Sequence, residues 1–187
     1  MLPALRGLLL AVKQLTAGGQ MICVHLIGTS AQPAGADTVG VAQIIRELEV
    51  SEYVRLEPGR QPYLDALRTM QDADALLLLG STDSHYTASK IFPCWLAKRP
   101  ILGLFHAAST VNPLARELGG VTLVTYGANS RPESRANELV AALRKVIADP
   151  IGALANRNEA AFEPYSARGV ARRYAALFDH ISNQPKR

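Results

Sequence analysis

Apolar and polar residues alternate along the chain in two patterns, one typical of buried strands and one typical of helices. Short unbroken apolar runs, such as Leu76–Leu79, have the length of strands that are buried on both faces. Longer segments place apolar residues three and four positions apart, as amphipathic helices do. These patterns predict helices at 2–16, 38–48, 63–72, 84–98, 112–118, 132–148 and 165–181, and strands at 21–27, 53–56, 76–79, 101–105 and 121–125.

The order of these elements favours a single α/β domain. Strands alternate with helices throughout, which is the pattern of a Rossmann-like, doubly wound parallel sheet. No internal repeat or linker divides the sequence, so we expect one domain over residues 1–182 and a polar tail over residues 183–187. The chain begins with a helix, whereas doubly wound nucleotide-binding domains normally begin with a central strand.

The composition and net charge of the chain limit which kinds of partner we expect it to bind. The 187 residues are 48% hydrophobic and 19% charged, which is typical of a globular domain and not of a disordered chain. The net charge of +4 suits a small anionic ligand or an ordinary solvated surface. No run of Lys and Arg with interleaved aromatic residues occurs in the sequence, so we expect no nucleic-acid partner.

The amino-terminal segment superficially resembles a signal peptide. Arg6 and Lys13 interrupt its apolar run, and its leucines fall at helical spacing, so an amphipathic helix explains it better. No apolar run reaches the length of a transmembrane helix. Cys23 and Cys94 show no metal-binding or redox spacing, and we expect buried free thiols in a reducing, cytoplasmic setting.

The loop that follows strand 76–79 is the strongest candidate for a binding site. In a doubly wound sheet a strand–loop–helix step presents free backbone N–H groups and a positive dipole end at the carboxyl edge, which suits a diphosphate. This loop is rich in Ser, Thr, His and Tyr, and Lys90 lies just beyond it. Pro93 either kinks the helix at 84–98 or marks its true start, in which case 81–91 is a long loop.

Four features of the sequence resemble the C-terminal, nucleotide-sugar-binding half of a GT-B glycosyltransferase of the group 1 type. They are RGLLLA at 6–11; VRLEPGRQP at 54–62 with YLDAL and DADA after it; ASKI at 88–91 with LAKRPIL at 96–102; and YSA at 165–167 before the last helix. The resemblance implies a hexosyltransferase-like enzyme that retains the anomeric configuration. It also implies that the acceptor-binding N-terminal domain and the first strand of this half are missing.

Two positions depart from the family pattern. The family carries a pair of glutamates around this loop and helix, and the matching positions here are His85 and Pro93. Recognition of a ribose by the second glutamate is therefore in doubt. The imidazole of His85 could still donate to a sugar or phosphate oxygen.

The resemblance assigns donor-binding roles to several residues, each with a plainer alternative. Lys90 would stabilise the departing diphosphate with Ser89 beside it, although both also suit an ordinary helix. Arg6 would contact phosphate, and Arg60 would lie near the nucleobase unless its loop is only surface. His106 follows a strand at the carboxyl edge. The full donor-binding set is Arg6, Arg60, Gly80, Ser81, Thr82, His85, Tyr86, Thr87, Ser89 and Lys90.

Two functions remain open at this point. The first is the donor-binding half of a glycosyltransferase, not competent alone, with a nucleoside-diphosphate sugar as substrate, no cofactor, no metal and no protein nucleophile. The second is a non-catalytic α/β nucleotide-binding or interaction module. A sheet that lacks its central strand leaves unpaired backbone groups, so we also expect a tendency to form a homo-oligomer.

Overall fold

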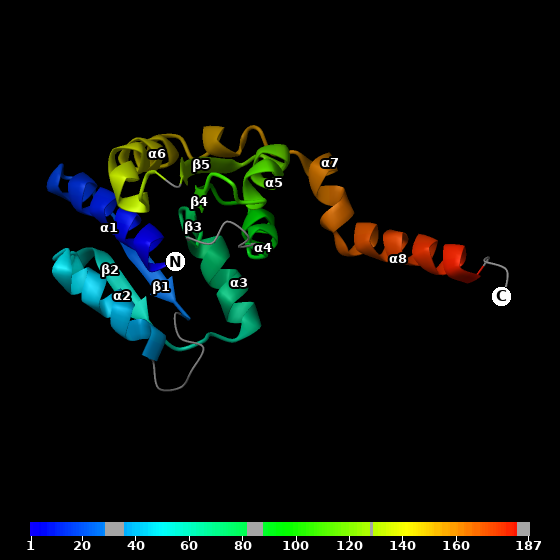
Figure 1. The fold of residues 1–187 in the computed structure, drawn as a ribbon, viewed down its shortest axis with the longest axis horizontal. Coiled ribbons are helices and arrows are strands. Elements are labelled where there is room, and N and C mark those ends of the chain that lie inside the picture. The colour runs from blue at the N-terminus through cyan, green and yellow to red at the C-terminus, as the bar shows by residue number, and fades with distance from the viewer. Residues whose placement is uncertain (29–35, 82–87, 128, 183–187) are drawn as a thin grey trace.

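The computed structural model describes residues 1–28, 36–81, 88–127 and 129–182 (Figure 1). The predicted tail, 183–187, lies outside them. The strands are β1 (Val24–Ile27), β2 (Val54–Glu57), β3 (Leu76–Leu79), β4 (Ile101–His106) and β5 (Val121–Tyr126). The α-helices are α1 (Leu2–Ala17), α2 (Ala36–Glu47), α3 (Tyr63–Asp72), α4 (Ile91–Leu96), α5 (Val111–Leu118), α6 (Ala136–Ala148), α7 (Glu159–Phe162) and α8 (Ala167–Ser182). Short 3₁₀ helices η1 (Ser51–Tyr53), η2 (Pro132–Arg135), η3 (Gly152–Leu154) and η4 (Glu163–Tyr165) join some of them.

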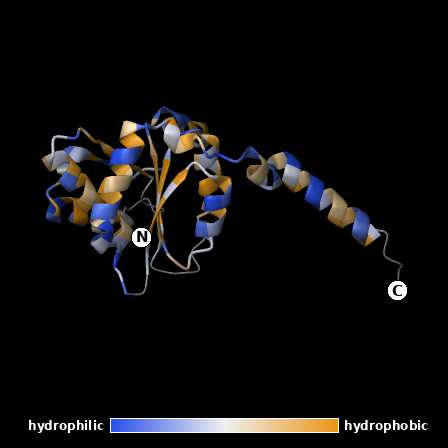
Figure 2. Cartoon of the chain, turned by 90° about the horizontal axis from the view of Figure 1, so that it is seen from above, coloured by the Kyte–Doolittle hydropathy of each residue, from blue (hydrophilic) through white to orange (hydrophobic). Residues whose placement is uncertain are grey.

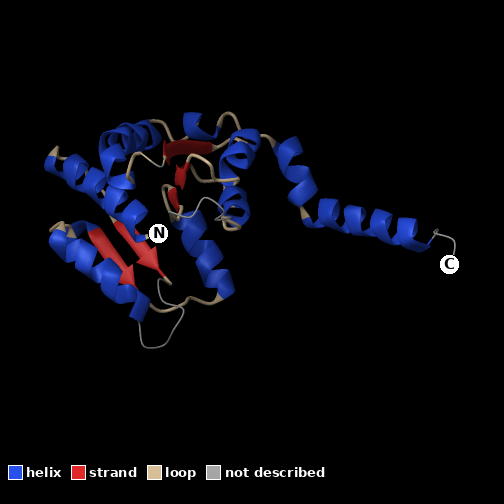
Figure 3. Cartoon of the chain, in the orientation of Figure 1, coloured by secondary structure: helices blue, strands red, loops and turns tan. Residues whose placement is uncertain are grey.

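The strands form two parallel sheets. β1 pairs with β2, with Val24 opposite Val54, and β4 pairs with β3 on one side and β5 on the other. No backbone ladder joins β1 to β3, although Figure 1 places β1 on the side of β2 nearer to β3. We call this interruption the sheet break; the strands on either side are separate in Figure 3. The predicted α/β class with parallel strands is confirmed.

Helix α1 connects the two sheets through one core. Its apolar stripe of Leu5, Leu8, Leu9 and Val12 is at most 2% exposed and packs with residues of both sheets, among them Val24, Val54, Leu102, Leu104 and Val124. Helix α1 also packs closely against η2, and residue 7 must be glycine at this contact. A Cβ on Gly7 would lie 2.6 Å from the carbonyl oxygen of Pro132. The sheets are therefore held together by side chains, while their backbones remain unjoined.

A second core lies between the three-stranded sheet and α4 and α5. Trp95, Phe105 and Leu118 are fully buried there, and Phe162 of α7 joins them. Cys94 belongs to this core and is buried as predicted. The expectation of a second buried thiol is wrong, because Cys23 lies ahead of β1 and is exposed.

The predicted bounds of the helix at 84–98 are wrong, because the described helix is shorter at both ends. Residues 88–90 precede the helix, α4 spans Ile91–Leu96, and residues 97 and 98 form a turn; residues 84–87 lie outside the described residues. Pro93 occupies the first turn, where its missing N–H has no intrahelical partner to lose. Lys98 has a positive φ of 56°, which ends the helical path. Pro93 thus marks the start of the helix, which was the alternative left open by the sequence.

Helix α8 extends away from the rest of the molecule (Figures 1 and 2). Every residue from Ala171 to Ser182 is exposed, so Tyr174, Leu177 and Ile181, which share one side of the helix, face solvent. In Figure 2 hydrophobic residues line the central strands, whereas α8 carries hydrophobic and hydrophilic residues side by side. None of the helices in the described part of the chain combines the length and apolarity that crossing a bilayer requires.

Candidate functional site

The loop after β3 is tied to the neighbouring strands where it begins. The Gly80 N–H donates to the Leu104 carbonyl at 2.8 Å, and the Tyr126 hydroxyl donates to the Ser81 carbonyl at 2.6 Å. A Cβ on Gly80 would lie 2.9 Å from the Phe105 ring and 3.0 Å from the Leu104 carbonyl oxygen. Close packing against β4 therefore explains why this residue is glycine.

His106 and Tyr126 complete the carboxyl ends of β4 and β5 beside this loop. Their rings meet edge to face with centroids 5.7 Å apart, and the His106 Nδ1 accepts from the Ala108 N–H at 3.2 Å. Burial raises the pKa of the Tyr126 phenol, so its hydroxyl stays protonated and can donate to Ser81 at neutral pH. The sequence patterns did not single out Tyr126, because its role depends on a residue 45 positions away.

Asn112 fixes the turn that follows His106. The Asn112 amide nitrogen donates to the carbonyls of His106 and Ala107 at 2.8 and 3.1 Å, and the side chain is buried. Its amide oxygen has no hydrogen-bond partner among the described residues. The three carboxyl strand ends are thus held by side-chain hydrogen bonds as well as by the ladder.

Ser89 and Lys90 lie directly before α4 and are exposed. Burial raises the pKa of the nearby Cys94 thiol to about 11, and the positive charge of Lys90 opposes this shift. Lys90 forms no ion pair with any carboxylate in the described part of the chain. The Lys90 ammonium therefore remains available to an anion from solution.

Arg6 differs from Lys90 in having a partner. Its guanidinium donates to the Glu47 carboxylate on α2 at 2.5 Å. Hydrogen bonds from Arg6 and then Gln43 lower the pKa of Glu47, which stays ionised at neutral pH. The described contacts of Arg6 thus lie between α1 and α2 and not at the loop after β3.

Arg60 lies near the carboxyl end of β1. It is exposed, and its Cα is 3.9 Å from the position that a Cβ would occupy on Gly28, the residue after β1. Gly28 has a φ of 66°, a conformation that favours glycine. The predicted Arg60 site is therefore at a carboxyl strand end, on the other side of the sheet break from Ser81.

Four predicted donor-binding residues, Thr82, His85, Tyr86 and Thr87, lie outside the described residues. Among the described residues, no three His, Cys, Asp or Glu side chains converge as metal ligands would. The described part of the predicted site is therefore Gly80, Ser81, Ser89 and Lys90 after β3, with Arg6 and Arg60 placed elsewhere.

The position of α4, and with it Lys90, is fixed by a group that we call the Trp95 cluster: Trp95, Leu118, Gly119, Arg157 and Phe162. The Trp95 indole N–H donates to the carbonyls of Leu118 and Gly119 at 3.2 and 3.1 Å. The Arg157 guanidinium lies 3.6 Å from the centre of the indole ring, and Phe162 stacks on the indole at 4.5 Å with 7° between the rings.

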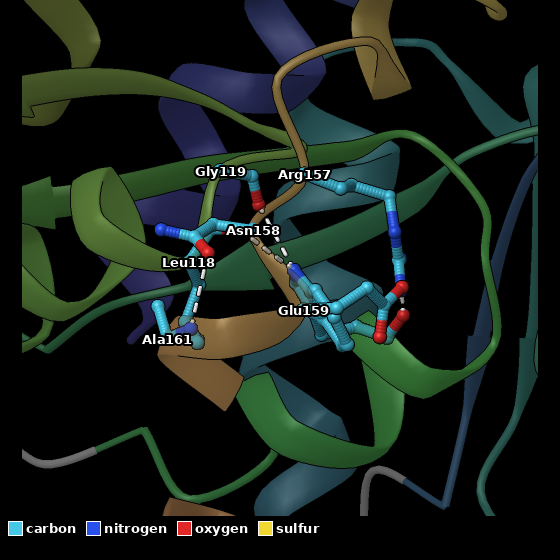
Figure 4. A network of polar contacts seen from close by, with 7 residues as sticks. Leu118, Gly119, Arg157, Asn158, Glu159 and Ala161 are labelled. Carbon is cyan, nitrogen blue, oxygen red and sulfur yellow. Dashed lines mark hydrogen bonds and ion pairs between the residues drawn. The ribbon is translucent and has the colours of Figure 1, made fainter. Parts of the chain in front are cut away.

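The segment around Arg157 is itself anchored, as Figure 4 shows. The Asn158 N–H donates to the Leu118 carbonyl at 2.8 Å, and the Asn158 side chain accepts from the Ala161 N–H at 3.1 Å. Glu159 forms an ion pair with Arg157 at 3.3 Å. Sequence patterns missed this cluster, because Arg157 and Trp95 are 62 positions apart.

Comparison with protein-family models, curated proteins and solved structures found no match to this chain.

Proposed function

We propose that this chain is the donor-binding half of a GT-B glycosyltransferase of the group 1 type, and that Ser81, Ser89 and Lys90 hold the diphosphate of a nucleoside-diphosphate sugar. The observation that carries the proposal is the exposed Lys90 ammonium, which has no carboxylate partner in the described part of the chain and follows the loop at the end of β3. Arg6, the other lysine or arginine predicted to contact phosphate, is already paired with Glu47.

The strand order supports the same proposal. A doubly wound sheet has the order 3-2-1-4-5-6, and removal of its first strand leaves 3-2 and 4-5-6. In this chain the two sheets have the orders β2–β1 and β3–β4–β5, which correspond to these two groups. The proposed domain is therefore a Rossmann-like GT-B half without its first strand.

The chemistry assigned to the chain is positioning and charge stabilisation. Negative charge grows on the diphosphate as the glycosidic bond breaks, and a fixed ammonium with nearby hydroxyl donors stabilises that charge. The acceptor would be presented by an N-terminal domain, and the anomeric configuration would be retained. The isolated chain would bind the donor and transfer little sugar.

A non-catalytic nucleotide-binding or interaction module is the second candidate. Pro93 in the first turn of α4 stands where the family has a carboxylate, and the Arg6–Glu47 ion pair uses a cation that the family directs at phosphate. Both features favour a protein that has kept the fold and has lost the glycosyltransferase activity.

Titration with UDP, GDP, ADP, UMP and inorganic diphosphate tests the proposal. We expect a nucleoside diphosphate to bind, and Lys90→Ala to weaken that binding by about tenfold to a hundredfold, which is the range for loss of one charge-assisted hydrogen bond. Lys145→Ala is the matched control, because Lys145 is an exposed lysine on α6.

Two results would contradict the proposal. One is the absence of any binding signal with every nucleotide at millimolar concentration. The other is equal weakening by Lys90→Ala and Lys145→Ala, which would indicate a general charge effect and not a site. Binding without sugar transfer, even with an added acceptor domain, would favour the non-catalytic module.

A further inference from the structure

His106, the last residue of β4, lies beside the start of the loop after β3. The register of these strands pairs Leu79 with Leu104, and the Gly80 N–H continues the ladder by donating to the Leu104 carbonyl at 2.8 Å. Two residues beyond Leu79 and Leu104 are Ser81 and His106, so these two residues lie opposite each other. His106 therefore adjoins the loop that carries the proposed diphosphate site.

Tyr126 supports the His106 ring from the other side. The two residues are opposite each other in the register of β4 and β5, and their rings meet with centroids 5.7 Å apart and planes 85° apart. Tyr126 is 2% exposed, and its hydroxyl donates to the Ser81 carbonyl at 2.6 Å, so its side chain extends across the strand that carries His106. The imidazole thus packs against a ring that is itself bonded to the loop.

The hydrogen bonds of the imidazole determine which ring nitrogen carries the proton. The Ala108 N–H donates to the His106 Nδ1 at 3.2 Å, so Nδ1 is the acceptor and the proton lies on Nε2. Among the residues that the structure describes, Nε2 has no hydrogen-bond partner. The side chain is partly exposed. A neutral N–H donor is therefore available at the carboxyl edge of the sheet.

The backbone of His106 is held as firmly as its ring. Its carbonyl accepts from the Ser109 N–H at 2.9 Å and from the buried Asn112 side chain at 2.8 Å. Because residue and ring are both fixed before a ligand arrives, a hydrogen bond from Nε2 would cost little further ordering.

We propose, with the proposed function as the basis, that His106 recognises a hydroxyl group of the donor sugar through its Nε2 N–H. A neutral N–H suits an uncharged hydroxyl acceptor, whereas the cation of the site, Lys90, suits the phosphates. In this role His106 selects the sugar and takes no part in bond breaking.

The order of the strands indicates that the sugar, and not the nucleoside, reaches His106. Across the carboxyl edge the strands follow one another as β2, β1, β3, β4 and β5, with the sheet break after β1 (Figure 1). Arg60, the predicted contact of the nucleobase, lies near the end of β1, and Ser81 follows β3. A donor with its base at Arg60 and its diphosphate at Ser81 directs its sugar towards the end of β4.

Two substitutions separate the Nε2 donor from the Nδ1 acceptor. His106→Asn keeps an amide oxygen near the position of Nδ1 and removes the donor, whereas His106→Gln places an amide N–H near the position of Nε2. Calorimetric titration of each variant compares UDP, GDP and ADP with UDP-glucose, GDP-mannose and ADP-glucose.

The expected result is a loss confined to the sugar nucleotide. His106→Asn should weaken its binding by about threefold to tenfold, the range for one neutral hydrogen bond, and should change the affinity for the matching nucleoside diphosphate by less than about twofold. His106→Gln should retain most of the affinity. Lys90→Ala should weaken both ligands by the same factor. Unchanged binding of the nucleoside diphosphate also shows that His106→Asn is folded.

Deoxy analogues of the sugar nucleotide make the test specific to one hydroxyl. The analogue that lacks the recognised hydroxyl should bind equally well to the unsubstituted chain and to His106→Asn, because the hydrogen bond is absent from both complexes. A structural role through Nδ1 alone would instead make His106→Gln the more damaging substitution and would affect all ligands alike.

Three results would overturn the proposal for His106. They are equal weakening of the sugar nucleotide and the nucleoside diphosphate by His106→Asn, no weakening of either, and a loss that persists with every deoxy analogue. Each of them leaves nucleotide binding through Lys90 in place, so the proposed function survives. The absence of binding by every nucleotide would overturn the proposed function and the role of His106 together.

Discussion

Two regions around the three-stranded sheet, the face covered by α4 and the free edge of β3, differ in how completely they are packed. Around α4 and β4, the Trp95 cluster closes the core, and the indole has hydrogen bonds, a cation on its ring and a stacked phenylalanine. At the sheet break, β3 has an unpaired edge and α3 has no buried residue. The same sheet is thus closely packed beneath α4 and incompletely packed at the sheet break.

This difference shows that hydrophobic residues alone do not close a core. Leu64 and Leu67 of α3 are as apolar as Ile91 of α4, but only α4 has a partner segment that packs across it. That segment, 156–162, brings backbone acceptors, Arg157 and Phe162 together. Closure depends on an element from a distant part of the sequence.

The largest expected effect is on stability when the closed side is truncated. Trp95→Ala should lower the free energy of unfolding by about 3–5 kcal/mol, because it leaves a cavity among Phe162, Leu118 and Arg157. Leu64→Ala, at a residue 64% exposed on α3, should change it by no more than about 0.5 kcal/mol. Urea unfolding measures both, and similar losses in the two variants would show that the closed and open sides do not differ.

Thiol labelling compares how readily reagent reaches the two regions, and it needs no substitution. Cys23 is exposed beside β1, whereas Cys94 is 6% exposed within the second core. We expect a neutral alkylating reagent to modify Cys23 at least about a hundredfold faster, because Cys94 reacts only after an opening that costs about 3 kcal/mol. Mass spectrometry of digested protein gives both rates. Comparable rates would mean that the core around α4 opens readily.

The smallest expected effect is a pH dependence on the closed side. Burial raises the pKa of Cys94 from 9.0 to about 11, so the folded protein keeps the thiol neutral while the unfolded chain ionises. The contribution of Cys94 is intact below about pH 9 and is lost as the pH rises towards 11. This loss should be on the order of 1 kcal/mol.

Denaturant unfolding at pH 8 to 11 checks this dependence. Cys94→Ala should show a shallower fall in stability over this range than the unsubstituted chain, whereas Cys23→Ala should show the same fall. Parallel curves for the unsubstituted chain and Cys94→Ala would mean that the thiol is as well solvated in the folded state as in the unfolded one.

Local signals predicted most of the elements. The bounds of α3 and β3 agree with the sequence prediction, because proline and glycine residues or short polar pairs delimit them. The helix at 84–98 was wrong because apolar periodicity continued through Pro93, whose first-turn preference set the true start near Ile91. The two-sheet arrangement was not predictable from patterns, since each strand looks equally buried in sequence.

The candidate site was less predictable than the fold. The sequence identified Ser89 and Lys90 as candidate ligands, either within a helix at 84–98 or in a loop over 81–91, and the structure places them exposed and directly before α4. It could not indicate that Arg6 binds Glu47, because the two residues are 41 positions apart. Tyr126 and Arg157 were missed for the same reason. Contacts between distant segments decide which polar residues remain available, and no local pattern reports them.

The isolation of α8 has a consequence for how heat affects the molecule. From Ala171 onward its residues contact solvent on all sides, so the helix is supported mainly by its own backbone hydrogen bonds. Isolated helices shorter than about 12–15 residues are marginal in water, and α8, with 16 residues, is only slightly longer than this limit. Its helix–coil equilibrium is therefore largely uncoupled from the body, and α8 loses helicity gradually on warming while the two cores melt cooperatively.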